Sequence, residues 1–144
     1  MSFGIDVNLL LYASDSGCPQ HERAAGFLQT CAADTQLFCL AWLTLMSYLR
    51  MATHPRILAQ PLTHQQAMAN VSALLALPHA RSLAEGESFW AHYRAVTGEV
   101  PARANLVPDA HLAAVLREHG VKVLYTHDRD FRKFDFLEVR DPLG

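Results

Sequence analysis

Short apolar runs alternate with amphipathic stretches along the whole chain, and this alternation constrains the fold more than any other feature. The runs that predict strands cover residues 3–7, 36–40, 78–83, 121–125 and 136–139. Stretches with helical spacing lie between them, at 8–13, 20–33, 43–51, 63–75, 85–96 and 108–119. Such alternation is typical of a parallel sheet covered by helices. The sequence therefore predicts a three-layer α/β/α fold with a central, mostly parallel sheet.

The ends of several helices are marked by particular residues. Pro108 lies at the start of the last helix, where its missing N–H costs nothing, and Gly120 follows as a C-terminal stop. Asn8 and Thr63 are expected to cap two earlier helices with their side chains. The polar stretch 97–105, which contains glycine and proline, is expected to be a loop.

The amino-acid composition limits the classes of protein to which this chain can belong. A chain of 144 residues with 51% hydrophobic residues favours a single domain, 1–144, with a packed core. Three cysteines without a CxxC pair are expected to be reduced thiols, and no signal peptide or membrane-spanning run is visible, which predicts a cytoplasmic protein. The net charge of −2 does not indicate a nucleic-acid binder, although ten of the 12 basic residues are arginines, which suit phosphate groups.

Acidic residues occupy positions where strands end or helices begin. Asp6 follows the first apolar segment, Asp109 opens a helix, and Asp128 and Asp130 follow the run at 121–125. In an open α/β sheet such positions converge on one crevice outside the carboxyl ends of the strands. Carboxylates brought together repel one another unless they are protonated or neutralised by a cation. The sequence therefore predicts a divalent-metal site and phosphodiester hydrolysis.

Each candidate residue has an expected role in that chemistry. Asp6 and Asp109 are the expected metal ligands. Asp128 and Asp130 are expected to complete a second metal site or to orient the attacking water, which the metal activates. The expected cation is Mg²⁺, with Mn²⁺ as the alternative.

Polar and basic neighbours of the aspartates complete the predicted site. Thr126 and Asn8 are expected to hold the water or a phosphate oxygen by hydrogen bonds. Arg129, beside the acidic end, is expected to bind an RNA phosphate, and a solvated charge is the alternative.

Some of these aspartates also have a purely structural interpretation. Asp109 suits the N-terminus of a helix through the helix dipole, and Asp130 could cap the turn before Phe131. Asp6 has the weakest structural role, because a carboxylate at the end of an apolar strand is costly to bury unless it is paired or bound to metal.

Four segments together resemble the motif blocks of PIN-domain proteins and, more narrowly, of VapC-type toxins of bacterial type II toxin–antitoxin modules. They are Ile5–Leu10, Leu49–Pro55, Asp109–Ala113 and Tyr125–Phe131, and the resemblance covers nearly the whole chain. It implies a PIN fold and a Mg²⁺-dependent endoribonuclease that forms a homodimer. It also implies a small antitoxin partner that inhibits the enzyme by inserting a C-terminal segment into the acidic groove. Matched position by position, Asp6 and Asp109 correspond to the family's metal-ligand aspartates, Asp128 to the third acid, and Asp130 to an additional acid.

The chain departs from the family pattern at one position. The family commonly has a glutamate three residues before the arginine of the Leu-Arg pair, and here that position is Ser47. Glu85, which follows the third predicted strand, is expected to substitute by pointing into the same crevice, and Glu87 is a weaker candidate. The alternative is that both glutamates only favour a helix N-terminus.

Other classes of function remain open at this point. A degenerate PIN domain that binds RNA or protein without cutting is the main alternative, because Ser47 removes one acid. A phosphoacceptor receiver-like domain also clusters aspartates, but no lysine lies suitably near the last strands. The eight histidines form no zinc motif, and only His111 and His127 flank acidic positions.

Overall fold

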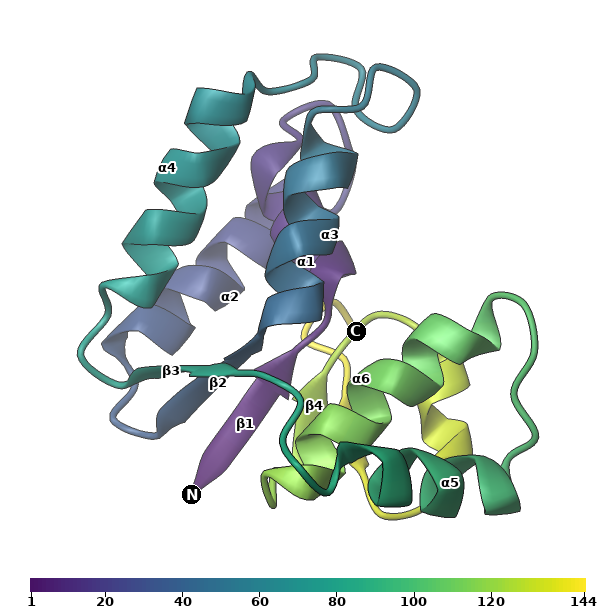
Figure 1. Cartoon of the computed structure of the whole chain (residues 1–144). Coiled ribbons are helices and arrows are strands. Elements are labelled where there is room, and N and C mark those ends of the chain that lie inside the picture. The colour runs from purple at the N-terminus through teal and green to yellow at the C-terminus, as the bar shows by residue number, and fades with distance from the viewer.

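A five-stranded parallel sheet lies at the centre of the computed structural model, which describes residues 1–144 (Figure 1). The strands are β1 (Ser2–Ile5), β2 (Leu37–Ala41), β3 (Ala80–Leu83), β4 (Val123–Tyr125) and β5 (Glu138–Arg140). Their order across the sheet is β3-β2-β1-β4-β5, and every neighbouring pair is parallel. The predicted parallel sheet is confirmed.

The strand order reverses between β1 and β4. From β1 the chain adds β2 and β3 on one side and later adds β4 and β5 on the other side. Gly4 pairs with Leu124 and Ile5 pairs with Tyr125, so the carboxyl ends of β1 and β4 lie next to each other. Open α/β sheets form their ligand crevices at such a reversal. The residue that follows β1 is Asp6, and its N–H donates to the Tyr125 carbonyl at 3.0 Å.

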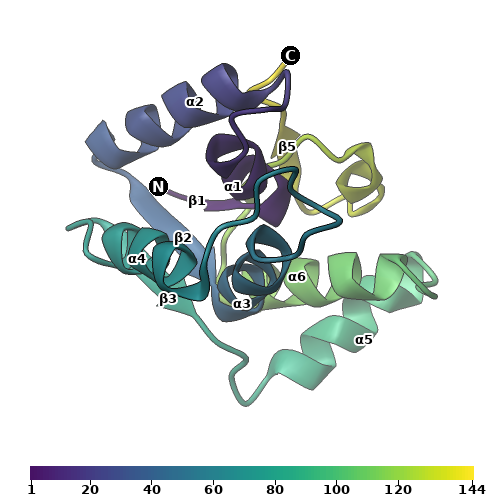
Figure 2. The ribbon, with the colours of Figure 1, turned by 90° about the horizontal axis from the view of Figure 1, so that it is seen from above.

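Helices cover both faces of the sheet. They are α1 (Val7–Ser14), α2 (His21–Ala33), α3 (Trp42–Ala52), α4 (His64–Leu75), α5 (Phe89–Glu99), α6 (Leu106–Glu118) and the short 3-10 helix η1 (Arg129–Lys133). Figure 1 shows α1 to α4 gathered in one group, and Figure 2 shows α5 and α6 side by side as a second group. No helix has both the length and the apolar character that a membrane crossing requires.

Alternating side chains of the strands build two separate cores. Phe3, Ile5 and Phe38 pack with α1 to α4, whereas Cys39 and Leu124 pack with α5 and α6. This is the period of two that a sheet buried on both faces requires. The helices bury their apolar sides against these residues, so the strand ends are held at fixed positions.

Several predicted helix ends are confirmed and one cap is different. Thr63 forms a capping box with Gln66, and Gly120 has a φ of 71° just after α6. The cap of α1 is Asp6 rather than Asn8, since its carboxylate accepts a 2.7 Å hydrogen bond from the Val7 N–H. Asp6 thus has a structural role that the sequence interpretation did not include.

Helix α5 starts four residues later than predicted. The segment 85–88 is a loop, because the Glu118 carboxylate accepts hydrogen bonds from the Gly86 N–H at 2.8 Å and the Ser88 N–H at 3.0 Å. The helix instead runs on to Glu99, into part of the stretch predicted to be a loop. The 3-10 helix η1 was not predicted.

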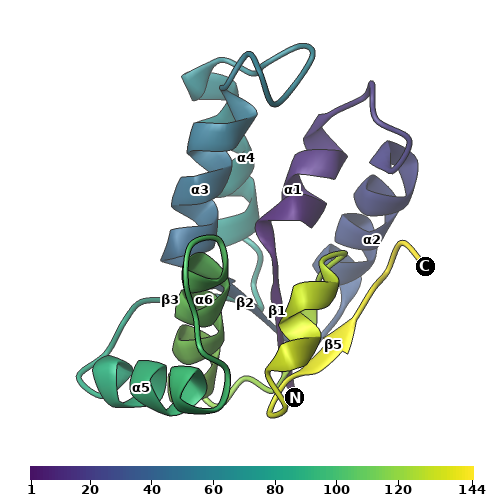
Figure 3. The ribbon, with the colours of Figure 1, turned by 90° about the vertical axis from the view of Figure 1, so that its right-hand side faces the viewer.

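The C-terminal residues close over the α2 side of the molecule. Figure 3 shows the C-terminus beside α2, where the Arg23 guanidinium donates to the Leu143 carbonyl. The Leu143 side chain is buried in the same core as α1 and α2. The end of the chain is therefore part of the packed domain.

We expect Gly4→Val to destabilise the fold, because Gly4 lets α6 approach β1 closely. A Cβ at this position would lie 2.9 Å from Cδ2 of the buried Leu116. Overpacking of this kind costs roughly 1–3 kcal/mol, which a thermal melt detects. The control is Gly26→Ala on α2, where a Cβ meets nothing within 4 Å and a small gain in melting temperature is expected. Equal melting temperatures for the two variants would contradict this packing argument.

Candidate functional site

Four aspartates from three parts of the chain meet at the carboxyl ends of β1 and β4. One carboxylate oxygen from each of Asp109, Asp128 and Asp130 lies within 4.8 Å of the other two. Asp6 and Asp109 line the same small cavity, of about 80 Å³. We refer to Asp6, Asp109, Asp128 and Asp130 as the acidic site. The structure brings together all four aspartates that the sequence singled out, while their individual roles stay predictions.

Helix α3 forms another wall of this cavity. Thr44 and Ser47 line it together with apolar side chains, among them Leu43 and Phe131. Ser47, the position of the missing family glutamate, therefore faces Asp6 and Asp109. Thr44 was not predicted, although its spacing of three residues from Ser47 places it on the same helix face.

The Thr126 hydroxyl connects the aspartates that follow β1 and β4. It donates to Asp6 Oδ2 at 2.8 Å and accepts the Asp128 N–H at 2.9 Å and the Asn8 Nδ2 at 3.4 Å. Its single proton and both lone pairs are therefore used. Thr126 is buried and positions Asp6 and Asp128, and it has no free proton for the water or phosphate oxygen that it was expected to hold.

Asn8 carries the one buried side-chain polar atom of the chain without a hydrogen-bond partner. Its Nδ2 donates to Thr126, and its Oδ1 accepts nothing. Buried polar atoms are nearly always paired, so an orphaned acceptor beside carboxylates indicates a missing donor. A water is such a donor, whether free or bound to a cation. The role of Asn8 in holding a water stays a prediction, and its unpaired Oδ1 is the atom that can accept the hydrogen bond.

The surroundings of the acidic site raise the pKa values of Asp6 and Asp109. Burial, followed by the charges of Asp128, Asp6 and Asp130, raises the pKa of Asp109 from 3.8 to about 7. Burial also raises the pKa of Asp6, against the lowering effect of its hydrogen bonds with Thr126 and Val7. A helix dipole that stabilised Asp109 would lower its pKa instead. Asp109 does lie in the first turn of α6, yet burial and repulsion from the other aspartates raise its pKa.

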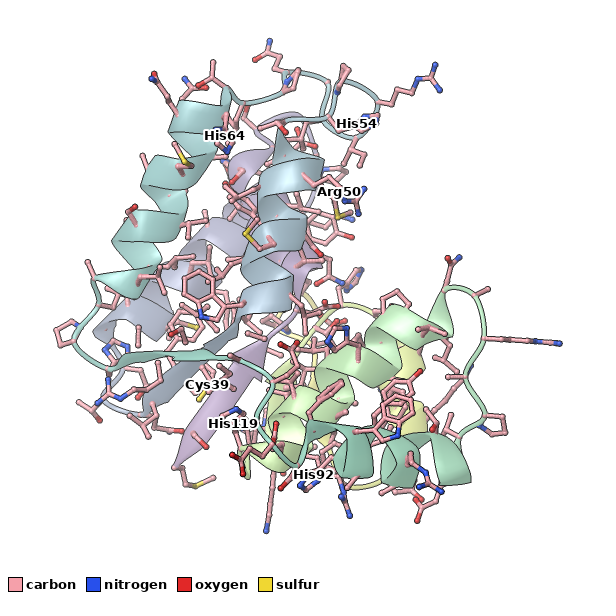
Figure 4. All side chains as sticks on the ribbon, in the orientation of Figure 1. Cys39, Arg50, His54, His64, His92 and His119 are labelled. Carbon is pink, nitrogen blue, oxygen red and sulfur yellow. The ribbon has the colours of Figure 1, made fainter.

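The donor set of the site fits a hard divalent cation. All the donors are carboxylate or amide oxygens, which Mg²⁺ and Mn²⁺ prefer, and a cation would relieve the repulsion and supply water to Asn8. The four aspartates would hold it, with one oxygen each of Asp109, Asp128 and Asp130 close enough to share one ion and Asp6 lining the same cavity as Asp109. No histidine or cysteine belongs to such a group anywhere in the chain. Figure 4 labels four of the histidines, which lie in two separate groups. His54 and His64 are at one end of the molecule, and His92 and His119 are at the other end.

Glu85 does not join the acidic site, contrary to the prediction that it replaces the missing acid. Its carboxylate lies 2.8 Å from His111 Nε2, and both side chains are exposed. His111 is two residues after Asp109 on α6, and residues two apart on a helix point to different sides. The loop that carries Glu85 therefore meets the side of α6 away from the aspartates. Glu87 lies in the same loop, before α5.

Basic side chains of η1 flank the acidic site. Arg129 and Arg132 are exposed and form no ion pair, whereas Lys133 lies 3.7 Å from Asp130. The cap of η1 is Asp128, which accepts the Asp130 N–H at 2.9 Å, so the predicted capping role of Asp130 is wrong. Arg129 is thus not engaged by an acidic side chain, and its binding of a phosphate group stays a prediction.

The raised pKa values predict how stability depends on pH. Between the ordinary pKa of Asp109 and its folded value of about 7, the folded chain binds more protons than the unfolded chain. The free energy of unfolding should therefore fall as pH rises from about 4 to about 7 and level off above that range. Asp6 contributes in the same direction. Thermal melts in EDTA across this range measure the slope.

Asp109→Asn should flatten this pH profile and leave the metal-free fold at least as stable at neutral pH. The matched control is Asp135→Asn, since Asp135 is exposed and lies outside the acidic site. A slope in Asp109→Asn as steep as in the unmodified protein, or a large loss of melting temperature, would show that Asp109 is structural.

Comparisons with known proteins agree with the geometry. The PIN domain family model matches residues 5–137. The chain is 41% identical over 144 residues to Ribonuclease VapC48 of Mycobacterium tuberculosis, covering 100% of this chain and 99% of that protein. It is 36% identical over 139 residues to Ribonuclease VapC43 of the same species, covering 96% and 94%.

Solved structures share the fold at lower sequence identity. The crystal structure of Mycobacterium tuberculosis VapC20, a sarcin-ricin loop cleaving toxin, has a TM-score of 0.69 and 19% identity over 96% of this chain and 98% of that one. A toxin–antitoxin complex from Klebsiella pneumoniae has a TM-score of 0.62 and 18% identity, covering 96% of each chain. The predicted PIN-like architecture is confirmed. The chain therefore belongs to the PIN-domain family and, within it, to the VapC-type toxins.

Proposed function

We propose that this protein is a Mg²⁺-dependent endoribonuclease and the toxin of a type II toxin–antitoxin pair. The observation that carries the proposal is the acidic site, in which four aspartates converge at the reversal of the strand order and Asp109 has a pKa of about 7. The full-length relatives named ribonucleases support RNA as the substrate.

The chain's own residues have defined tasks in this reaction. Asp109, Asp128, Asp130 and Asp6 would hold Mg²⁺, or Mn²⁺ in its place. When bound, the cation neutralises charge on the phosphate and lowers the pKa of its water. Thr126 keeps Asp6 and Asp128 in place.

Water is the proposed nucleophile, and no covalent enzyme intermediate is expected. This agrees with the hydrogen bonds of the histidine rings, none of which involves a serine hydroxyl or a cysteine thiol. The Asn8 Oδ1 can accept a hydrogen bond from the water and orient it. Arg129 would bind a phosphate oxygen of the RNA on the exposed side.

The proposed partners are a small antitoxin and a second copy of the chain. The structural likeness to a solved toxin–antitoxin complex supports the antitoxin. Three large apolar side chains support a homodimer, because Trp42 and Met46 on α3 and Trp90 on α5 are exposed by 41%, 57% and 64%. The cytoplasm is the proposed location, where RNA substrate and antitoxin are made.

The central test is RNA cleavage with and without a divalent cation. We expect the protein to cut total RNA in Mg²⁺ or Mn²⁺ and to be inactive in EDTA. Asp6→Asn and Asp109→Asn should lower the rate by more than the roughly 10- to 100-fold loss typical of residues that support metal ligands. Asp135→Asn is the control. Cleavage in EDTA, or full activity of Asp109→Asn, would contradict the proposal.

The position of the missing acid gives a second test, on the metal rather than on the RNA. Ser47→Glu adds a carboxylate to the cavity wall opposite Asp6 and Asp109, so it should lower the Mg²⁺ concentration needed for half-maximal cleavage. Glu85→Gln should leave that concentration unchanged, because Glu85 contacts His111. If Glu85→Gln raised that Mg²⁺ concentration and Ser47→Glu left it unchanged, Glu85 would belong to the metal site. A protein that binds RNA and cuts it only after Ser47→Glu would be the non-cleaving binding module.

A further inference from the structure

Two aromatic side chains lie together beside the acidic site and have no part in the proposed metal chemistry. The rings of Tyr12 and His127 meet edge to face, with centroids 6.0 Å apart and an interplanar angle of 77°. His127 directly precedes Asp128 in the chain. Tyr12 lies on α1, the helix that Asp6 caps. Both residues are half-buried.

The Tyr12 hydroxyl is free to bind a ligand. Side chains on a helix lean toward its N-terminus, so the Tyr12 ring leans toward the end of α1 that Asp6 caps. Burial, followed by the charges of Cys18, Asp6, Asp128 and Asp141, raises the pKa of Tyr12, which agrees with this placement. No residue of the chain forms a hydrogen bond with the Tyr12 hydroxyl.

The His127 ring is held in one orientation. Its Nδ1 lies 2.8 Å from Asp141 Oδ2, and the other oxygen of Asp141 accepts the Leu143 N–H at 2.9 Å. A carboxylate at Nδ1 selects the form in which Nδ1 carries the proton, so Nε2 points away from Asp141. No residue of the chain bonds to Nε2, and the side chain is 38% exposed.

We infer that Tyr12 and His127 form a base-binding subsite for the nucleotide next to the cleaved phosphate of single-stranded RNA. Unpaired bases stack on tyrosine and histidine rings, and the base edges form hydrogen bonds. The free Tyr12 hydroxyl and His127 Nε2 can donate or accept such hydrogen bonds. In a duplex both base faces are covered. This inference rests on the proposed function, since it takes the acidic site as the place where the phosphate is held.

Core packing is the competing explanation for this pair. Tyr12 also packs against the core that contains α1 and α2, so a large truncation tests stability as well as binding. Tyr12→Phe keeps the ring and removes only the hydroxyl. His127→Ala removes a half-buried ring at the edge of the site. A comparison of the two variants with thermal melts separates binding from folding.

The experiment measures RNA binding in an Asp109→Asn background, in Mg²⁺, by fluorescence anisotropy. The probes are a labelled single-stranded 12-nucleotide RNA of mixed sequence, the same strand with abasic sites, and the same strand in a duplex. We expect His127→Ala to weaken binding of the intact strand about tenfold, which is within the range for loss of one base stack. Tyr12→Phe should weaken it roughly two- to tenfold. Neither variant should change binding of the abasic strand or the duplex.

The matched controls are His64→Ala and Tyr93→Phe. His64 is an exposed histidine at the start of α4, at the end of the molecule opposite His92 and His119 (Figure 4), and Tyr93 lies on α5. Both controls should bind all three RNAs like the parent.

The outcomes separate the subsite from the nuclease proposal. If the unmodified protein cuts RNA and the Tyr12 and His127 variants bind the intact strand like the parent, the subsite is wrong and the nuclease proposal stands. Equal losses for intact and abasic strands would assign the pair to the RNA backbone and overturn base binding. A base-dependent loss in a protein that never cuts RNA would support the subsite and end the nuclease proposal.

Discussion

Four carboxylates that repel one another must be held in place, and the Thr126 hydroxyl provides the central contact. It joins Asp6, at the end of β1, to the backbone of Asp128, beyond β4, and it also receives the Asn8 amide. The sheet and α6 bring the residues of this site together. The sheet places the ends of β1 and β4 side by side, and α6 approaches β1 closely over Gly4, which brings Asp109 to the same cavity.

The repulsion among the aspartates also makes the acidic site informative about the charge of its ligand. A fold gains nothing from like charges held close together, so such a cluster is typical of a site for a ligand of opposite charge. Asp6 has a second role as a helix cap, which partly offsets the cost of its burial. Asp109 has no hydrogen-bond partner of this kind, and burial together with the charges of the other three aspartates raises its pKa to about 7.

The sequence pattern predicts those parts of the structure that depend on residues close together in the chain. Apolar runs followed by aspartates were enough to place the strands and the acidic site, because parallel strands end at the same edge. The position of Glu85 was not predictable in this way. It depends on which side of α6 a loop meets, and that loop is set by Glu118, 32 residues away from Gly86. Thr126 was recognised as a site residue, but its three hydrogen bonds became visible only in the folded chain.

The central position of β1 also has a consequence for protein synthesis. The strand that carries Asp6 is made first, yet its neighbour β4 and the partner hydroxyl of Thr126 are separated from Asp6 by 120 positions. Domains fold only once their long-range contacts can close, and translation supplies the C-terminal strands last. A nascent chain therefore has no complete acidic site before Asp128 and Asp130 are made, and a product that terminates before Thr126 lacks both of these aspartates.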